Sequence, residues 1–290
     1  MKLNFEFCRR ALLLACLVTG MSFTARAEDP KKVLVVSCTV EFFHTSTVIA
    51  GKVLTQLGND SKAFVVADVV HSGPRPKDKD KEAAWMEKMK ADLADKMSAT
   101  ALKNYDAIIF ASTTGVLPLP DKQAFLDYIK SGKGFVGIHS ASDTFHPKKG
   151  EPQLDPYIEM LGGEFLTHGR QVGVECLVQD MDHPATQFSG NAREKDQSFC
   201  LEQEEIYTFK NYDPTKVHEL LILDKDPQNK MKPGHFAVSW CKEYGQGKVF
   251  YTSLGHNEFV WENKKYQRHL LGGIKWALGL APGDATPQAK

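Results

Sequence analysis

The first half of the chain alternates short apolar runs with amphipathic segments of helical length. Four runs predict buried strands: "KKVLVVSCT" (31–39), "KAFVVADVV" (62–70), "YDAIIFAST" (105–113) and "GFVGIHSAS" (134–142). Continuous hydrophobicity of this kind is typical of parallel strands covered on both faces. The stretches between them predict helices over 46–58, 85–93 and 120–132. This alternation favours a flavodoxin-like, doubly wound α/β fold, with a mostly parallel sheet and helices on both faces.

The sequence changes character after residue 150. A short helix is predicted within 153–165, and alternating stretches at 171–180, 201–210, 216–224 and 235–255 predict added strands and β-hairpins. A helix over 265–279 and a loose tail over 280–290 complete the chain. Because no repeat or linker divides it, we expect a single domain over residues 28–290, with its core at about 32–279.

The first 27 residues carry the parts of a secretory signal peptide. A basic start, "MKLNFEFCRR", precedes a 13-residue apolar segment, and Ala25 and Ala27 suit cleavage after Ala27. A lipoprotein signal ending at Cys16 is less favoured, because the apolar segment continues past that cysteine. We therefore expect a periplasmic or secreted protein. No other run approaches the ~18 apolar residues of a membrane span, so no membrane span is expected after the signal peptide is removed.

The charge of the chain and the spacing of its cysteines exclude several classes of protein and site. The chain has 36 basic and 36 acidic residues, of which four basic and one acidic lie in residues 1–27, so the mature chain is slightly acidic. Such a chain has no electrostatic attraction for nucleic acid. Cysteines 38, 176, 200 and 241 form no C-x-x-C pair, so a cysteine zinc site is not expected and any disulfide pairing stays open. Cys38, at the end of an apolar strand, fits a buried free thiol.

Six motifs in fixed order resemble one family. They are "FFHTS" (42–46), "GKGFVGIHSASD" (132–143), "LGGEFLTHG" (161–169), "DHPAT" (182–186), "EEIY" (204–207) and "YGQGKVFYTSLGH" (244–256) followed by Trp261. Together they are similar to the trehalose-utilisation (ThuA-like) family. That resemblance implies a flavodoxin-like fold related to class I glutamine amidotransferases. It also implies a role in the use of disaccharides or their keto derivatives.

The related amidotransferases carry their nucleophile in a G-x-C-x-G turn, which corresponds here to Gly137-Ile138-His139-Ser140-Ala141. Histidine replaces the cysteine, so no thiolate is available for an acyl-enzyme step and we exclude amidotransferase activity. Ser140 lies one residue past the tip, which disfavours a serine hydrolase. Downstream, His256 and Glu258 keep a His-x-Glu pattern similar to that of the amidotransferases.

Three histidines follow predicted strands. His44 follows the first, His139 the fourth, and His256 the late strand "KVFYTSL". Because ligands bind at the carboxyl ends of strands in open α/β sheets, we expect these side chains to converge. With Glu205 of "EEIY" they would hold a divalent metal, with Zn²⁺ the best fit. No nucleotide cofactor is indicated.

Further residues are candidates for proton transfer and substrate binding. Asp143 joins His139 and His256 as a catalytic candidate, and imidazoles can exchange protons near neutral pH even without a metal. The candidate substrate-binding residues are Tyr207, Ser140, His168 and Trp261. Each has a structural alternative, because a histidine at a strand end often only makes hydrogen bonds and a tryptophan often packs in the core.

Taken together, the motifs and the strand-end histidines predict an exported ThuA-like carbohydrate-utilisation protein. Its expected activity is metal-assisted hydrolysis, elimination or isomerisation of a disaccharide or keto-sugar. The alternative is a non-catalytic sugar-binding or scaffold module of the same fold. The expected partner is a small sugar, and a homo-oligomer is left open.

Overall fold

The computed structural model of the protein describes residues 29–146, 154–190, 198–226, 229 and 231–288. The predicted signal peptide, residues 1–27, and its cleavage point lie outside these ranges. Within them, no helix is both long enough and apolar enough to cross a membrane.

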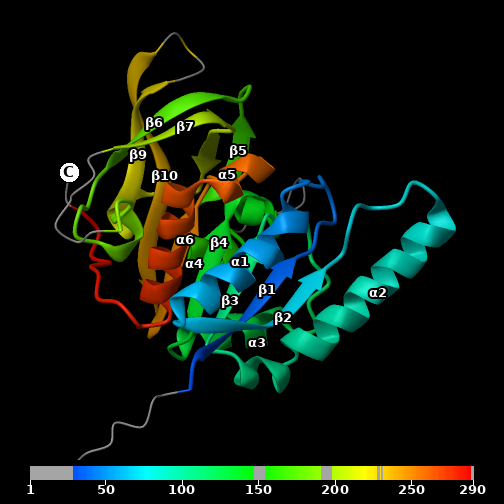
Figure 1. Ribbon diagram of the computed structural model, residues 1–290. Coiled ribbons are helices and arrows are strands. Elements are labelled where there is room, and N and C mark those ends of the chain that lie inside the picture. Colours follow the sequence, from blue (N-terminus) through cyan, green and yellow to red (C-terminus); the bar gives the residue numbers. More distant parts are fainter. Residues whose placement is uncertain (1–28, 147–153, 191–197, 227–228, 230, 289–290) are drawn as a thin grey trace, which may run out of the picture.

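One large sheet runs through the described chain in the order β2-β1-β3-β4-β11-β10-β9-β6-β7 (Figure 1). The first five strands of this order are parallel to one another. Their bounds are β2 Phe64–His71, β1 Lys31–Ser37, β3 Ala107–Ala111, β4 Gly134–Ile138 and β11 Gly247–Thr252. The carboxyl ends of these strands therefore lie along the same edge of the sheet, as the alternation of strands and helices predicts.

The remaining strands are antiparallel additions, which confirms the predicted hairpins. The large sheet gains β10 Lys232–Tyr244, β9 His218–Asp226, β6 Val172–Val178 and β7 Ser198–Glu204. A separate two-stranded sheet pairs β5 Glu164–His168 with β8 Tyr207–Lys210. The fold is thus the mixed α/β, flavodoxin-like arrangement predicted from the sequence.

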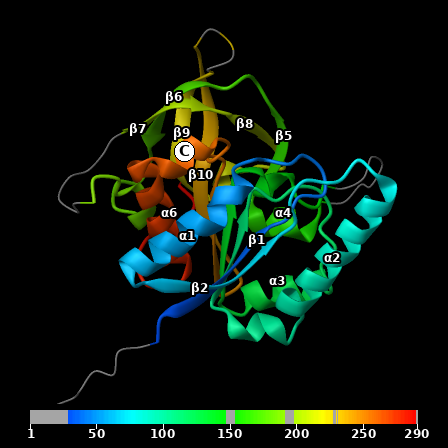
Figure 2. The ribbon, with the colours of Figure 1, turned by 45° about the vertical axis from the view of Figure 1, so that its right-hand side comes forward.

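Helices cover both faces of the parallel strands, and Figure 2 shows α1 and α6 on one side with α2 and α3 on the other. One core lies under α1 Thr47–Ser61, α5 Glu258–Glu262 and α6 Lys264–Ala277. The other lies under α2 Lys79–Met97, α3 Lys122–Lys130 and α4 Pro156–Leu161. In β1, Val33 and Val35 face the first core while Leu34 and Val36 face the second, as the two-residue period of a strand requires. Within the described ranges, four 3₁₀ turns complete the elements: η1 Ala101–Asn104, η2 His139–Asp143, η3 Pro184–Thr186 and η4 Pro214–Lys216.

Two helices are longer than the sequence predicted. Helix α1 continues past Gly58 to Ser61, and Lys62 then takes a left-handed conformation with φ of 54°. Gly58 serves packing rather than termination, because a Cβ there would lie 2.7 Å from the carbonyl oxygen of Phe64. Helix α2 begins at Lys79 rather than at residue 85, because the Asp78 side chain caps it by accepting a hydrogen bond from the Lys81 amide.

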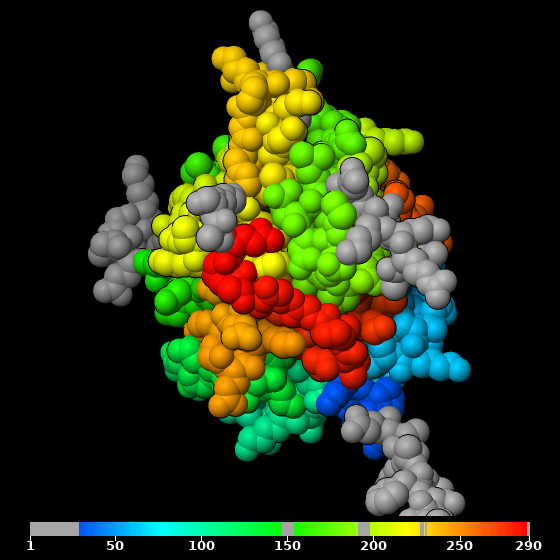
Figure 3. Space-filling model, turned by 90° about the vertical axis from the view of Figure 1, so that its left-hand side faces the viewer, coloured from blue at the N-terminus to red at the C-terminus, as the bar shows by residue number. Residues whose placement is uncertain are grey.

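The described part of residues 280–290, for which a loose tail is predicted, makes hydrogen bonds with the rest of the protein. Figure 3 shows this segment, in red, lying across the surface of the molecule. Trp276 Nε1 donates to the Gly283 carbonyl at 3.0 Å, and His218 Nδ1 donates to the Thr286 carbonyl at 2.7 Å. These hydrogen bonds attach the tail to α6 and β9.

The cysteines of the described chain are all free thiols. Cys38 is buried, as predicted, together with Cys176 and Cys241, whereas Cys200 is exposed on β7. Burial raises the pKa of the Cys38 thiol to about 12, so this group stays protonated and behaves as a small apolar side chain.

Candidate metal centre

His139 lies at the turn where β4 ends and η2 begins. Its φ is +52°, a left-handed conformation that costs a non-glycine residue roughly 1–2 kcal/mol. Neighbouring groups stabilise the turn: the His139 carbonyl accepts from the Tyr251 hydroxyl at 2.8 Å, and its Nδ1 lies 2.8 Å from the Ser253 carbonyl. The strand-to-turn corner predicted from the sequence is therefore present, with an imidazole at its tip.

The hydrogen bond to Ser253 sets the tautomer of His139. A carbonyl oxygen can only accept, so Nδ1 must carry the proton and Nε2 keeps its lone pair. The Tyr207 hydroxyl lies 2.9 Å from Nε2 and donates to it. Burial lowers the pKa of His139 well below its usual value, so the ring is neutral at pH 7. Nε2 thus carries a lone pair, which accepts the Tyr207 hydrogen bond in this structure and which a metal ion would take in its place.

His44 approaches the same point from the loop between β1 and α1. Its ring centroid lies 4.6 Å from that of His139, edge to face. Its Nδ1 lies 3.2 Å from the Ser140 hydroxyl, and the Thr47 hydroxyl donates to its carbonyl at 2.7 Å. Burial lowers the pKa of His44 to about 4, so this imidazole is also neutral at pH 7.

His256 and Glu205 complete the group. His256 follows β11, and its Nδ1 lies 3.2 Å from His139 Nε2 and 3.1 Å from Glu205 Oε2. Glu205 directly follows β7, at the far end of the sheet order. Burial is the largest single effect on His256 and lowers its pKa, but the hydrogen bond to Glu205 and the negative charges of nearby glutamates together outweigh burial and raise the pKa.

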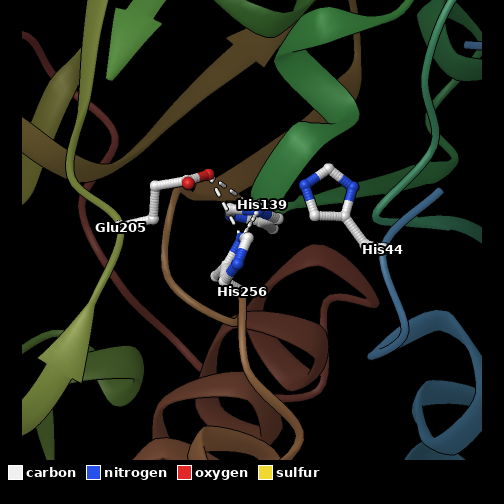
Figure 4. A group of neighbouring side chains, drawn as sticks. All are labelled: His44, His139, Glu205 and His256. Carbon is white, nitrogen blue, oxygen red and sulfur yellow. Dashed lines mark hydrogen bonds and ion pairs between the residues drawn. The ribbon is translucent and has the colours of Figure 1, made fainter. Parts of the chain in front are cut away.

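The four side chains point toward one another in Figure 4. One nitrogen from each of His44, His139 and His256 and one oxygen of Glu205 all lie within 4.8 Å of one another. We call these four residues the histidine–glutamate cluster. Ligands about 2.0–2.1 Å from a zinc ion at tetrahedral angles lie roughly 3.3 Å apart. The separations among His139 Nε2, His256 Nδ1 and Glu205 Oε2 are 3.1, 3.2 and 3.8 Å, so these three donors are spaced to hold a small divalent ion. The His44 nitrogen lies within 4.8 Å of them.

Three of the predicted substrate residues border this cluster. Tyr207 contacts His139, and His168 Nδ1 lies 3.0 Å from Glu205 Oε1. They are paired partners across β5 and β8, so the two-stranded sheet brings both to the same side. The side chain of His168 is 43% exposed, so it marks the side on which the otherwise buried histidine–glutamate cluster is open to solvent. Ser140 also borders the cluster, because its hydroxyl lies 3.2 Å from His44 Nδ1.

Asp143 does not join the cluster. Its carboxylate is bound by His146 Nε2, and the other ring nitrogen of His146 lies 2.6 Å from Glu164 Oε1. Glu164 also accepts from Lys210 and Asn211, so this is a separate polar network between η2 and the two-stranded sheet. Its position at a strand end suggested a catalytic role for Asp143, but the side chain points to His146 instead.

The structure contradicts a substrate-stacking role for Trp261. The side chain is 0% exposed and packs in the core under α1 and α6. Its Nε1 donates to the Gly255 carbonyl at 2.9 Å, so it supports the turn that carries His256. Glu258, the acidic member of the His-x-Glu pattern, hydrogen-bonds Thr45 and also lies outside the cluster.

Sequence reasoning did not single out Phe42, a neighbour of the cluster, or His146, which belongs to the separate network around Asp143. Phe42 is 64% exposed, and its ring centroid lies 4.7 Å from that of His44. The signal was its place in "FFHTS", two residues before a predicted ligand. His146 was also passed over, although it lies three residues beyond Asp143 and bridges two carboxylates.

Fold and site together define a flavodoxin-like α/β protein with a buried histidine–carboxylate cluster at the carboxyl edge of its sheet. The family model described as ThuA, trehalose utilisation, matches residues 32–277, so the chain belongs to the ThuA family.

Solved structures agree with this fold. A ThuA-like protein from Parabacteroides merdae has 19% identity and a TM-score of 0.63, covering 86% of this chain and 90% of its own. Another from Bacteroides uniformis has 20% identity and a TM-score of 0.59, covering 87% and 93%. At these identities the likeness concerns the fold alone. A comparison with curated proteins gave no match.

Proposed function

We propose that this protein is an exported, metal-assisted enzyme that acts on a disaccharide or keto-sugar by hydrolysis, elimination or isomerisation next to a carbonyl. The observation that carries the proposal is the convergence of four potential ligand atoms within 4.8 Å at the carboxyl edge of the sheet. Membership of a trehalose-utilisation family supports a carbohydrate substrate.

The donor set supports Zn²⁺ or a similar divalent ion, held by His44, His139, His256 and Glu205. Three imidazoles and one carboxylate match the ligands that zinc prefers, and two of the imidazoles are neutral at pH 7. A bound ion would supply Lewis acidity, either to polarise a sugar carbonyl or to lower the pKa of water.

Protein groups around the cluster supply the remaining functions. Burial raises the pKa of the Tyr207 phenol, which therefore stays protonated and acts as a hydrogen-bond donor. His168 is the most exposed of the titratable neighbours, and it can exchange protons with a substrate on the open side. Its contact with Glu205 orients that carboxylate toward the histidines.

Phe42 supports a ring-shaped substrate. Its exposed ring lies against His44, at the rim of the cluster. The loop that carries it is fixed, because the Phe42 carbonyl accepts from the Thr114 hydroxyl at 3.0 Å. A rigid aromatic face offers the apolar C–H face of a sugar a surface to stack on, at little entropic cost.

Metal analysis of the purified mature protein tests the proposal. We expect about one divalent ion per chain, loss of that ion in His139→Ala, and chelator-sensitive turnover in a panel of disaccharides and their keto derivatives. His71→Ala is the matched control, because His71 lies on β2 outside the cluster. No bound ion, together with unchanged ligand binding in His139→Ala, would overturn the proposal. Binding without turnover, insensitive to chelator, would favour a non-catalytic sugar-binding module.

Export rests on the signal-peptide pattern of residues 1–27. Expression of the full chain in a Gram-negative host should give a periplasmic protein whose N-terminal residue is Glu28. A cytoplasmic protein that retains Met1 would contradict this part of the proposal.

A further inference from the structure

Glu204 is a buried carboxylate immediately before the candidate ligand Glu205. It is the last residue of β7 and has no exposed surface. Its Oε1 accepts from the Glu205 amide at 2.8 Å and from the His256 amide at 3.2 Å. Its Oε2 accepts from the Gly255 amide at 2.8 Å. Both oxygens are therefore used by backbone donors, which leaves neither directed at the histidine–glutamate cluster.

The two hydrogen bonds from the Gly255 and His256 amides join two segments that are far apart in sequence. One is the end of β7, which carries Glu205, and the other is the turn after β11, which carries His256. The turn is tightly packed: Gly255 has φ of +110°, and a Cβ there would lie 2.4 Å from the Tyr266 hydroxyl. The amides of 255 and 256 face away from any strand partner, so a buried acceptor has to satisfy them.

We propose that Glu204 is the positioning residue of the metal centre: by accepting from both segments, it sets the separation between Glu205 Oε2 and His256 Nδ1. This inference rests on the proposed function, since it takes those two atoms as metal ligands. It goes further because it assigns the neighbouring acid of "EEIY" a role that differs from that of Glu205. Groups that orient metal ligands commonly change metal affinity about 10–100-fold when they are altered.

The test uses Glu204→Gln, which keeps the size of the side chain but places an NH₂ group against backbone amides. The matched control is Glu219→Gln, another buried carboxylate, on β9 outside the cluster. Zn²⁺ affinity is measured by competition with a chromophoric chelator, and the visible spectrum of the Co²⁺-substituted protein reports ligand geometry. Glu204→Gln should bind Zn²⁺ about 10–100-fold more weakly and shift the Co²⁺ spectrum, while the control stays within about threefold of wild type.

Wild-type affinity and an unchanged Co²⁺ spectrum in folded Glu204→Gln would overturn the inference. If the glutamine variant does not fold, Glu204→Asp provides the same test, because it keeps the charge but withdraws the oxygens by one methylene group.

A second readout separates this inference from the proposed function. Should the wild-type protein bind no ion, the proposed function fails, and amide hydrogen exchange then decides the inference alone. Faster exchange at Gly255 and His256 in Glu204→Gln than in Glu219→Gln would still support the positioning role. Equal exchange in both variants would overturn it.

Discussion

At the scale of single residues, the polar network around His146 is sensitive to pH. Burial alone would lower the pKa of His146, but its hydrogen bonds to Asp143 and Glu164 outweigh burial and raise the pKa above its usual 6.5. A raised pKa means that protonation favours the folded state. The stabilisation is therefore fully present below pH 6.5 and is lost as the pH rises through the raised value.

This gives a prediction with a definite sign. The free energy of unfolding lost in His146→Ala, measured by urea denaturation, should be larger at pH 6 than at pH 8.5. For His71, whose pKa burial lowers, the corresponding loss in His71→Ala should grow with pH. A loss in His146→Ala that is independent of pH would show that this imidazole is not charged in the folded protein.

Phe42 permits a kinetic prediction at the same scale. If its exposed ring stacks on a sugar, Phe42→Ala should raise KM about tenfold with kcat changed less than about threefold, because an aromatic contact of roughly 0.5–1.5 kcal/mol is lost together with the ring's buried area. Phe42→Tyr should behave like wild type. Phe259→Ala is the control, since that exposed ring lines a groove with Cys200 and Glu202 instead. Equal KM values in the two alanine variants would exclude a substrate contact.

At the scale of elements, the "DHPAT" motif has a structural role. His183 Nδ1 accepts from the Ala185 amide at 3.1 Å and so begins η3, as expected for a residue that shapes the turn before a proline. Helix α6 then passes directly over η3 at Gly272, where a Cβ would lie 2.0 Å from the Pro184 carbonyl oxygen. This glycine is required by close approach of two backbones.

Gly272→Ala should therefore destabilise the protein by roughly 3 kcal/mol, at the upper end of overpacking effects, because backbone atoms rather than a flexible side chain must move. Gly73→Ala is the comparison: φ is +65° but nothing lies within 4 Å of the new Cβ, so a cost of about 1 kcal/mol is expected. Thermal and urea unfolding of both variants measure the difference. A Gly272→Ala variant no less stable than Gly73→Ala would contradict this packing.

Elements also show where sequence reasoning succeeded and where it failed. The alternating pattern predicted the parallel strands, and the ends of β1, β4 and β11 brought three predicted histidines together because those strands share one edge. Asp143 has a similar position, yet its side chain turns to His146, since the direction of a side chain beyond a strand end has no fixed period. Trp261 lies near the site in sequence but supports it from the core. The predicted end of α1 at Gly58 was wrong, because this glycine is needed for close packing and does not end the helix.

At the scale of the whole molecule, the cluster brings together residues from 44 to 256, so the proposed metal binding would be coupled to global folding. Zn²⁺ at about 100 times its Kd should stabilise the folded protein by about 2.7 kcal/mol, because the unfolded chain lacks the assembled site. Thermal unfolding with zinc and with chelator measures this, and Glu205→Gln should abolish most of the difference. An identical melting temperature in zinc and in chelator for the wild-type protein would contradict a preformed site.

The order of the sheet also bears on how the chain reaches its folded state. Strand β11 lies beside β4, although more than a hundred residues separate them, and β10 through β7 extend the sheet from there. Until β11 arrives, the fully apolar β4 is an open strand with unpaired amides and carbonyls, which is a template for association between chains. Newly made protein should therefore depend on chaperones until residues 247–252 are available, and fragments ending before residue 247 should aggregate rather than fold.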